Sequence, residues 1–149
     1  MTRIRSIKWQ LVFIASLGTV IFLLAALVVF VAFYGHFVDP GREQAFYSKF
    51  ALDTSEPLLF CLSPFVMYIV SRWLAGKAGR AFYLHALLFL ILYYVLDTSL
   101  LLFTPGMDWP AFFGSFVAVK HLLVMSVQVA GVLVGARLAE RECSAKQNS

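Results

Sequence analysis

The stretch AFFGSFVAVKHLLVMSVQVAGVLVGA, residues 111–136, is mostly apolar and contains one formally charged side chain, Lys120, near its middle. A run of roughly 20 apolar residues is enough to cross the hydrocarbon core of a bilayer as an α-helix, so this stretch predicts a transmembrane helix. Three further stretches, residues 9–34, 52–74 and 81–103, are equally apolar and long enough to cross. The sequence therefore predicts an all-α integral membrane protein with four transmembrane helices in an antiparallel bundle.

The composition agrees with this class, because 61% of the residues are hydrophobic and only 13% are charged, with a mean hydropathy of +0.84. These values lie outside the range of soluble domains. The longest connection between the predicted helices, residues 35–51, is too short to bury a core of its own. We therefore expect a single transmembrane domain over residues 1–149, ending in a polar cytoplasmic tail at 137–149.

The first apolar stretch is also preceded by Arg3, Arg5 and Lys8, as the hydrophobic part of a signal peptide would be. That part of a signal peptide spans roughly 7–15 residues, and the stretch at 9–34 is much longer. No clear small-x-small cleavage motif precedes Gly35. We expect an uncleaved first helix.

The positions of the basic residues predict the orientation in the membrane. Cytoplasmic connections are enriched in Lys and Arg, so the more basic side of the bundle is expected to face the cytoplasm. The opposite side has only Arg42 and Lys49. Because the basic residues are divided among short segments at the membrane surface, we expect no nucleic-acid partner. Both termini are predicted to be cytoplasmic, together with the second connection, and the basic residues on that side are Arg3, Arg5, Lys8, Arg72, Lys77, Arg80, Arg137, Arg141 and Lys146.

The connection between the first two helices contains a shorter helix signal. Asp39 can cap a helix whose first position is Pro40, and Phe46, Tyr47 and Phe50 then fall on one side of it. Aromatic side chains are enriched at the membrane–water interface. We predict a short interfacial helix on the outer side, as an anchor in preference to a substrate gate.

Lys120 marks the candidate functional site, because a charged side chain at the centre of a membrane helix costs about 3 kcal/mol on insertion scales. At the usual helical rise, Asp97 and Glu56 lie about 9 Å and about 6 Å below the outer surface, within reach of a long lysine side chain. We expect Lys120 to pair with Asp97 first and with Glu56 second. His121 is the next residue along the helix. Such a cluster suits either a structural clamp between helices or a relay for protons or ions.

Asp53 and Glu56 have a second interpretation. The sequence Asp53-Thr54-Ser55-Glu56-Pro57 is typical of a helix start, with a capping side chain, an acid at the positive end of the helix dipole and proline in the first turn. We expect helix capping here. Glu56 is the better member of a polar cluster because it lies deeper.

Two backbone features predict helix packing. Gly131 and Gly135 form a GxxxG motif near the cytoplasmic end of the last helix, where two small residues on one face allow close helix contact. We expect this contact within the bundle in preference to a dimer interface. Pro64 lies inside the second helix, removes one backbone hydrogen bond and predicts a kink there.

The histidines and cysteines predict no cofactor site. His36, His85 and His121 are expected at different depths, and a haem held by two histidines needs both at one level. Cys61 lies in a membrane helix and Cys143 in the tail, too far apart for a disulfide. The sequence has no CxxC or zinc-ligand spacing and no nucleophile–base pattern. We therefore expect no metal and no cofactor, and an enzyme is the least favoured class.

Two classes of function remain. The first is an accessory or partner-binding subunit that docks through its helices to a larger membrane complex. The alternative is a small oligomeric transporter or channel, in which the polar cluster moves protons, ions or an anionic or lipidic substrate. Either class acts in the lipid bilayer, with another membrane protein or a second copy of the chain as partner. The compact connections favour a bacterial inner membrane.

Overall fold

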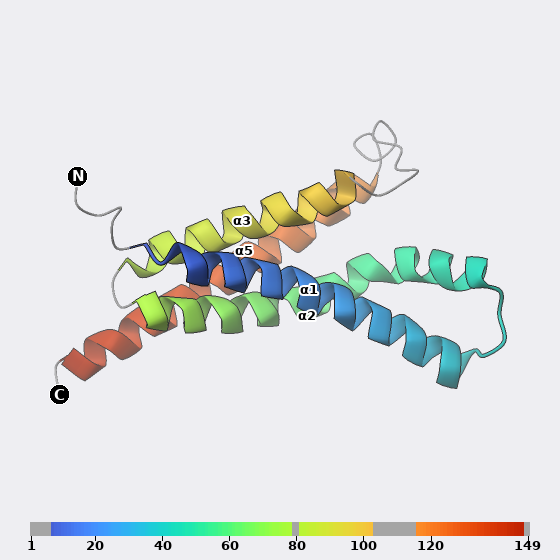
Figure 1. Ribbon diagram of the computed structural model, residues 1–149, viewed down its shortest axis with the longest axis horizontal. Helices are drawn as coiled ribbons and strands as arrows, with labels where there is room; N and C mark the ends of the chain where they lie inside the picture. The colour runs from blue at the N-terminus through green and yellow to red at the C-terminus, as the bar shows by residue number, and fades with distance from the viewer. Residues whose placement is uncertain (1–6, 79–80, 103–115, 148–149) are drawn as a thin grey trace.

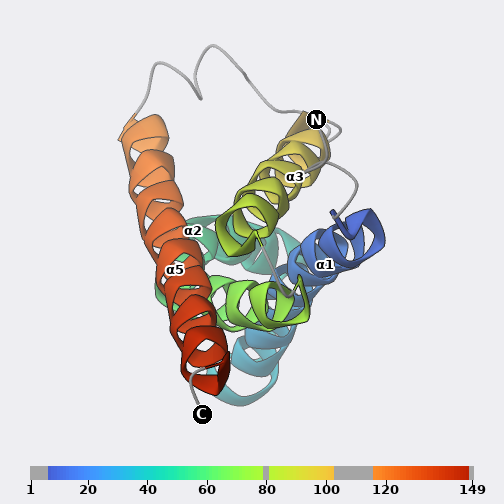
Figure 2. The same cartoon turned by 90° about the vertical axis from the view of Figure 1, so that its left-hand side faces the viewer.

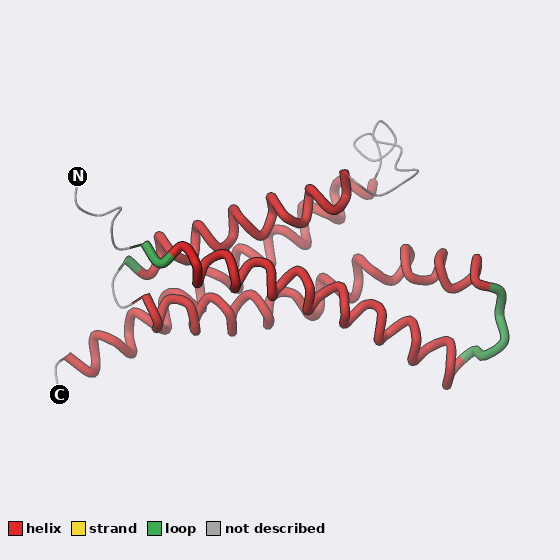
Figure 3. The backbone as a smooth tube through the Cα atoms, viewed as in Figure 1, coloured by secondary structure: helices red, strands yellow, loops and turns green. Residues whose placement is uncertain are grey.

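The computed structural model describes residues 7–78, 81–102 and 116–147. Over these ranges the chain is helical and contains no strand (Figures 1 and 3). The prediction that the chain is all-α is therefore confirmed for this part. The elements are α1 (Trp9–Phe33), the π-helical turn η2 (Tyr34–Val38), α2 (Gln44–Ala78), α3 (Phe82–Leu102) and α5 (Phe116–Gln147).

Within the described ranges, four helical segments are long and apolar enough to cross a membrane, as expected for a multi-pass membrane protein. Large apolar side chains are exposed along them, among them Val28 and Val29 on α1, each 66% exposed. A surface of this kind is unfavourable in water and favourable in lipid. The four segments are Trp9–Val38, Gln44–Ala78, Phe82–Leu100 and Val119–Ala145.

The bundle has two distinct ends (Figure 1). The start of α1, the start of α3 and the ends of α2 and α5 lie at one of them, which we call the terminal end. The connection between η2 and α2 lies at the other, the loop end. The most extensive helix contact is between α2 and α5, and α1 packs against α2 and α3 (Figure 2). The buried core draws on all four helices and includes Val12, Leu23, Met67, Leu74, Phe89, Val132 and Ala136.

The second helix begins earlier than the sequence predicts. It starts at Gln44, so the predicted start at residue 52 and the capping role of Asp53 and Glu56 are wrong. Inside the helix, the hydroxyl groups of Thr54 and Ser55 bond back to carbonyl oxygens one turn earlier, as such residues do in helix interiors. They therefore do not terminate the helix, and Glu56 becomes an interior residue.

Aromatic contacts explain the early start of α2. The Tyr47 hydroxyl donates a hydrogen bond of 2.7 Å to the Asp39 carbonyl oxygen, and the rings of Tyr34 and Phe50 stack with centroids 4.0 Å apart. Gly41 has a φ of 85°, in the left-handed region, so the segment forms a turn where we expected a helix start. The aromatic residues of the predicted interfacial helix lie in the first turns of α2, and no separate interfacial helix occurs in the described ranges.

The fourth helix also extends beyond its predicted end. It continues from residue 136 to Gln147, through most of the stretch predicted to be a polar tail. Side chains of this extension contact other helices, because Arg72 pairs with Glu142 and the Tyr83 hydroxyl lies 2.9 Å from Glu140 Oε2. Residues 103 and 111–115, which the sequence assigns to the third and fourth helices, lie outside the described residues.

The middle of α2 carries two prolines, Pro57 and Pro64, inside a continuous helix. Each proline lacks the N–H group that would bond to the preceding turn, so bending is expected there. In Figures 1 and 3, α2 changes direction in its middle part. The bend divides α2 into a loop-end part, whose Phe50 stacks on Phe30 of α1, and a terminal-end part, whose Ser71 bonds to α5.

Candidate functional site

Two glycines bring α5 close to α2. A Cβ atom added to Gly131 would lie 2.5 Å from the carbonyl oxygen of Pro64, and one added to Gly135 would lie 2.5 Å from that of Tyr68. Because only glycine tolerates such an approach, the GxxxG motif allows the two backbones to meet. Ser71 Oγ then donates a hydrogen bond of 2.7 Å to a main-chain carbonyl of α5. We call this line of contact the α2–α5 seam.

At the loop end of the seam, an ion pair joins the two helices. Lys120 Nζ lies 3.7 Å from Glu56 Oε2, and the Glu56 side chain is 25% exposed. Glu56 is the second of the two partners expected from the sequence, and within the described ranges no ion pair joins Lys120 to Asp97. The ion pair borders a cavity of about 250 Å³, whose other walls are Pro57, Phe60, Cys61, Leu123 and Val124.

Asp97 faces α5 on the other side. It lies half-buried on α3 and interacts electrostatically with His121. Further into the bundle, the Tyr94 hydroxyl lies 3.0 Å from Gln128 Oε1. The Gln128 amide nitrogen in turn lies 3.4 Å from the hydroxyl of buried Tyr93. Polar groups thus continue from the loop end toward the middle of the bundle between α3 and α5.

The four side chains Glu56, Asp97, Lys120 and His121 form what we call the loop-end cluster. Adjacent residues of a helix point about 100° apart, so Lys120 can face α2 while His121 faces α3. The cluster therefore spans three helices. Asp53, a further candidate from the sequence, is exposed one turn away and forms no ion pair with any described residue.

The sequence indicates that Tyr93, Tyr94 and Gln128 add hydrogen-bonding groups to the interior, but it does not identify which of them pair. A signal was present, because Gln128 follows His121 by seven residues and so shares its helix face. Tyr94 and Asp97 are similarly three residues apart on α3. The spacing of these residues identifies a polar face on each helix. It does not show that the two polar faces contact each other.

The terminal end holds a second set of polar contacts between helices. Arg72 pairs with Glu142 on α5 and donates a hydrogen bond of 3.0 Å to the Tyr68 hydroxyl. Lys8 Nζ donates to the carbonyl oxygen of Lys77 at 2.6 Å, and so binds one of the last carbonyls of α2. Each end of the α2–α5 seam is thus closed by an ion pair, with about 24 Å of α2 between Glu56 and Arg72 at the usual helical rise.

His85 has a local structural role at the terminal end. It is fully buried, and its Nε2 accepts a hydrogen bond of 3.3 Å from the backbone nitrogen of Lys8. Its Nδ1 lies 3.0 Å from the carbonyl oxygen of Ala81. The imidazole therefore ties the start of α1 to the start of α3. Over the residues that the structure describes, no group of three or more His, Cys, Asp or Glu side chains could hold a metal ion.

The loop-end cluster offers a carboxylate–ammonium pair and a carboxylate–imidazole pair. These groups can hold helices together or exchange protons, and no serine, threonine or cysteine among the described residues is hydrogen-bonded to a carboxylate or an imidazole. No family model, curated protein or solved structure matches this chain.

Proposed function

We propose that this chain is a small accessory subunit that docks through its helices to a larger membrane protein, with its termini in the cytoplasm. The observation that supports this most directly is the use of the charged side chains. Glu56 pairs with Lys120 and Arg72 with Glu142, each time between α2 and α5. Charges used in this way stabilise the fold of the subunit and leave recognition to its apolar surface.

A groove between α1 and α2 is the proposed docking surface. Its volume is about 460 Å³, and no atom lies within 4 Å of a Cβ added to Gly18. Small residues on a membrane helix allow a second helix to approach closely, and Ala15 and Thr19 lie beside Gly18 in this groove. The occupant we propose is one transmembrane helix of the larger partner.

Gentle detergent extraction of the tagged full chain, followed by identification of co-purifying chains, tests this function. We expect one larger membrane protein in stoichiometric amount. Gly18→Leu is expected to lose about 90% of the partner, because nothing lies within 4 Å of the added Cβ and the rest of the side chain enters the groove. Leu24→Phe is the matched control, since Leu24 is exposed on the same helix and lies outside the groove.

A partner retained equally by both variants would contradict the proposed groove. A chain that is always extracted alone, or only with copies of itself, would contradict the accessory function. The chain must remain monodisperse after extraction in each variant, so that loss of the partner is not loss of the fold.

A second function, proton or ion transport, is favoured by the polar groups between α3 and α5. Asp97 and His121 lie at the loop end, and the contact between Tyr94 and Gln128 continues inward from them. Such a row of polar groups can carry protons, because ionisable residues inside membranes often mark proton relays. It stops, within the described residues, at buried Tyr93.

Reconstitution in vesicles with an internal pH-sensitive dye separates the two functions. For an accessory subunit we expect the proton flux of protein-containing vesicles to equal that of empty vesicles. Transport would be established by a flux above this level that Asp97→Asn lowers by about tenfold, which corresponds to a rise of about 1.4 kcal/mol in the barrier. Asp53→Asn is the control, because Asp53 lies on α2 outside the loop-end cluster.

A further inference from the structure

Three cavities follow one another along the outer side of the α2–α5 seam. The cavity of about 250 Å³ at the loop end shares Phe60 and Cys61 with a middle cavity of about 660 Å³. The middle cavity shares Tyr68 with a third, of about 470 Å³, at the terminal end. We call this succession of three cavities, whose neighbours share lining residues, the α2–α5 furrow.

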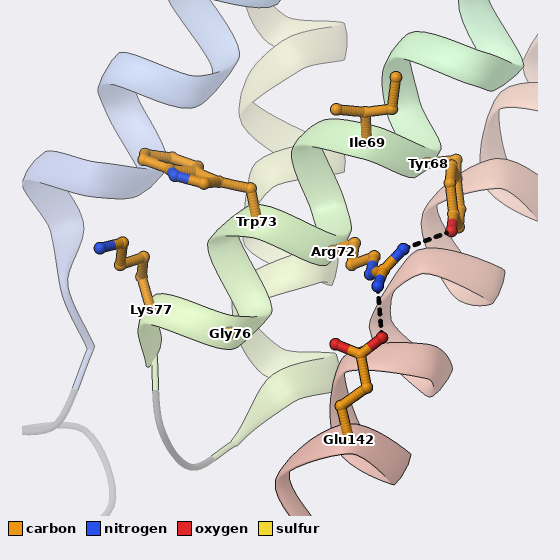
Figure 4. A pocket seen from close by; sticks show the side chains of 7 residues that line it. All are labelled: Tyr68, Ile69, Arg72, Trp73, Gly76, Lys77 and Glu142. Carbon is orange, nitrogen blue, oxygen red and sulfur yellow. Dashed lines mark hydrogen bonds and ion pairs between the residues drawn. The ribbon is translucent and has the colours of Figure 1, made fainter.

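The terminal end of the furrow is polar (Figure 4). Arg72 and Glu142 lie on one side of it, and Trp73 and Lys77 on the other. Between them Gly76 forms an open floor, with no atom within 4 Å of an added Cβ. A guanidinium–carboxylate pair on one side and an ammonium group on the other therefore flank an opening that any larger residue at Gly76 would reduce.

The donors at this end are not all used by contacts with described residues. Arg72 bonds Tyr68 and Glu142, yet a guanidinium group carries five N–H donors. The Lys77 ammonium group makes no hydrogen bond with any described residue, and in Figure 4 it points away from Glu142. An arginine and a lysine beside a half-exposed tryptophan suit a phosphate group at the membrane surface.

The middle of the furrow has the opposite character. Its walls include Phe65, Ala130 and Val134, together with the glycine contact at Gly131, and none of these side chains carries a charge. One leaflet of the hydrocarbon core is about 15 Å thick. Since about 24 Å of α2 separates Arg72 from Glu56, an acyl chain of ordinary length ends before it reaches the loop-end ion pair.

We propose that the α2–α5 furrow binds an anionic phospholipid, with its phosphate between Arg72 and Lys77 and one acyl chain along the apolar middle. Charge at one end and apolar walls beyond it match a single amphiphile lying along the membrane normal. Basic pockets between membrane helices bind anionic headgroups in this way. Ile69 and Trp73 line both the terminal end of the furrow and the groove between α1 and α2.

Trp73 provides a local probe of this site. In a chain carrying Trp9→Phe and Trp109→Phe, Trp73 is the remaining tryptophan. Quenching of its fluorescence by brominated phosphatidylglycerol, compared with brominated phosphatidylcholine in the same vesicles, measures the preference for the anionic lipid. We expect a preference of about fivefold, the effect of one basic residue beside an anionic surface.

Two pairs of variants test the two halves of the furrow. Lys77→Gln is expected to bring the preference close to one, whereas Lys49→Gln, at the other end of α2, leaves it unchanged. Ala130→Phe fills the apolar part and is expected to lower quenching by both lipids, whereas Leu133→Phe, exposed outside the furrow, has no effect. Gly76→Leu fills the open floor of the furrow. It is expected both to bring the preference close to one, as Lys77→Gln does, and to lower quenching by both lipids, as Ala130→Phe does. Because leucine is favoured over glycine inside a helix, this variant keeps the helix.

Three results would overturn the proposal. The first is equal quenching by the two lipids in the chain with Trp73 alone. The second is a preference that survives Lys77→Gln and Gly76→Leu in folded protein. The third is loss of the preference when soluble glycerol phosphate is added at the concentration of the lipid headgroup, which would assign the site to a soluble phosphate compound. Circular dichroism and size-exclusion chromatography confirm that each variant is folded.

Discussion

Replacing Gly135 with alanine is expected to lower the free energy of unfolding by about 1–3 kcal/mol, the usual cost of forcing an extra methyl group into a packed contact. The added Cβ atom would lie 2.5 Å from the Tyr68 carbonyl oxygen and 3.0 Å from the Arg72 backbone nitrogen. Both are main-chain atoms of α2, so no side chain can rotate away and the helices must separate. Gly131→Ala meets the Pro64 carbonyl oxygen in the same way, and the double variant is expected to be less stable than either single one.

Gly18→Ala is the matched control, because nothing lies within 4 Å of its added Cβ. Alanine is favoured over glycine inside a helix by about 1 kcal/mol, so this change should preserve or raise stability. Thermal unfolding in one detergent, followed by circular dichroism and by the monodisperse size-exclusion peak, compares the variants. Equal melting temperatures for Gly135→Ala and Gly18→Ala would show that the close contact between α2 and α5 does not form.

The helical spans could be predicted from the sequence, because apolar composition over roughly 20 residues decides membrane insertion. The helix ends could not. The start of α2 at Gln44 depends on contacts such as the stacking of Tyr34 on Phe50, which joins two different helices. The extension of α5 likewise includes the pairing of Glu142 with Arg72. Such contacts join residues that are far apart in the chain, so a short stretch of sequence does not predict them.

The candidate site could be predicted only in part for a related reason. Counting residues along the apolar stretches indicates how deep each residue lies in the bilayer. It therefore predicts that four residues gather toward one end of the bundle: Glu56, Asp97, Lys120 and His121. The choice of partner depends on the order of the helices around the bundle and on the direction of each side chain. In the structure α5 lies between α2 and α3, so Lys120 meets Glu56 and His121 meets Asp97.

Neutralising one member of the ion pair between Glu56 and Lys120 is expected to cause the second large loss of stability. Lys120→Met removes the positive charge that the Glu56 carboxylate faces in an apolar setting. Glu56→Gln removes the negative charge that the Lys120 ammonium group faces. We expect each single change to destabilise the bundle by about 3 kcal/mol, the cost of one charge on insertion scales, and to lower the amount of folded protein in the membrane. The double change Glu56→Gln with Lys120→Met removes both charges and should restore most of this loss.

Exchanging the two residues gives the sharpest form of this test. Glu56→Lys combined with Lys120→Glu keeps one positive and one negative side chain at these two facing positions, so a clamp between α2 and α5 should survive the exchange. Asp53→Asn combined with Lys120→Met is the control, and it should be as unstable as Lys120→Met alone, because Asp53 forms no ion pair among the described residues. If neither the double neutral variant nor the exchanged pair recovers folded protein, the two residues are not coupled and the clamp is refuted. Recovery of the fold by both, measured as a coupling energy of about 1–3 kcal/mol, would mean that the membrane charges of this chain are used to hold its own helices together.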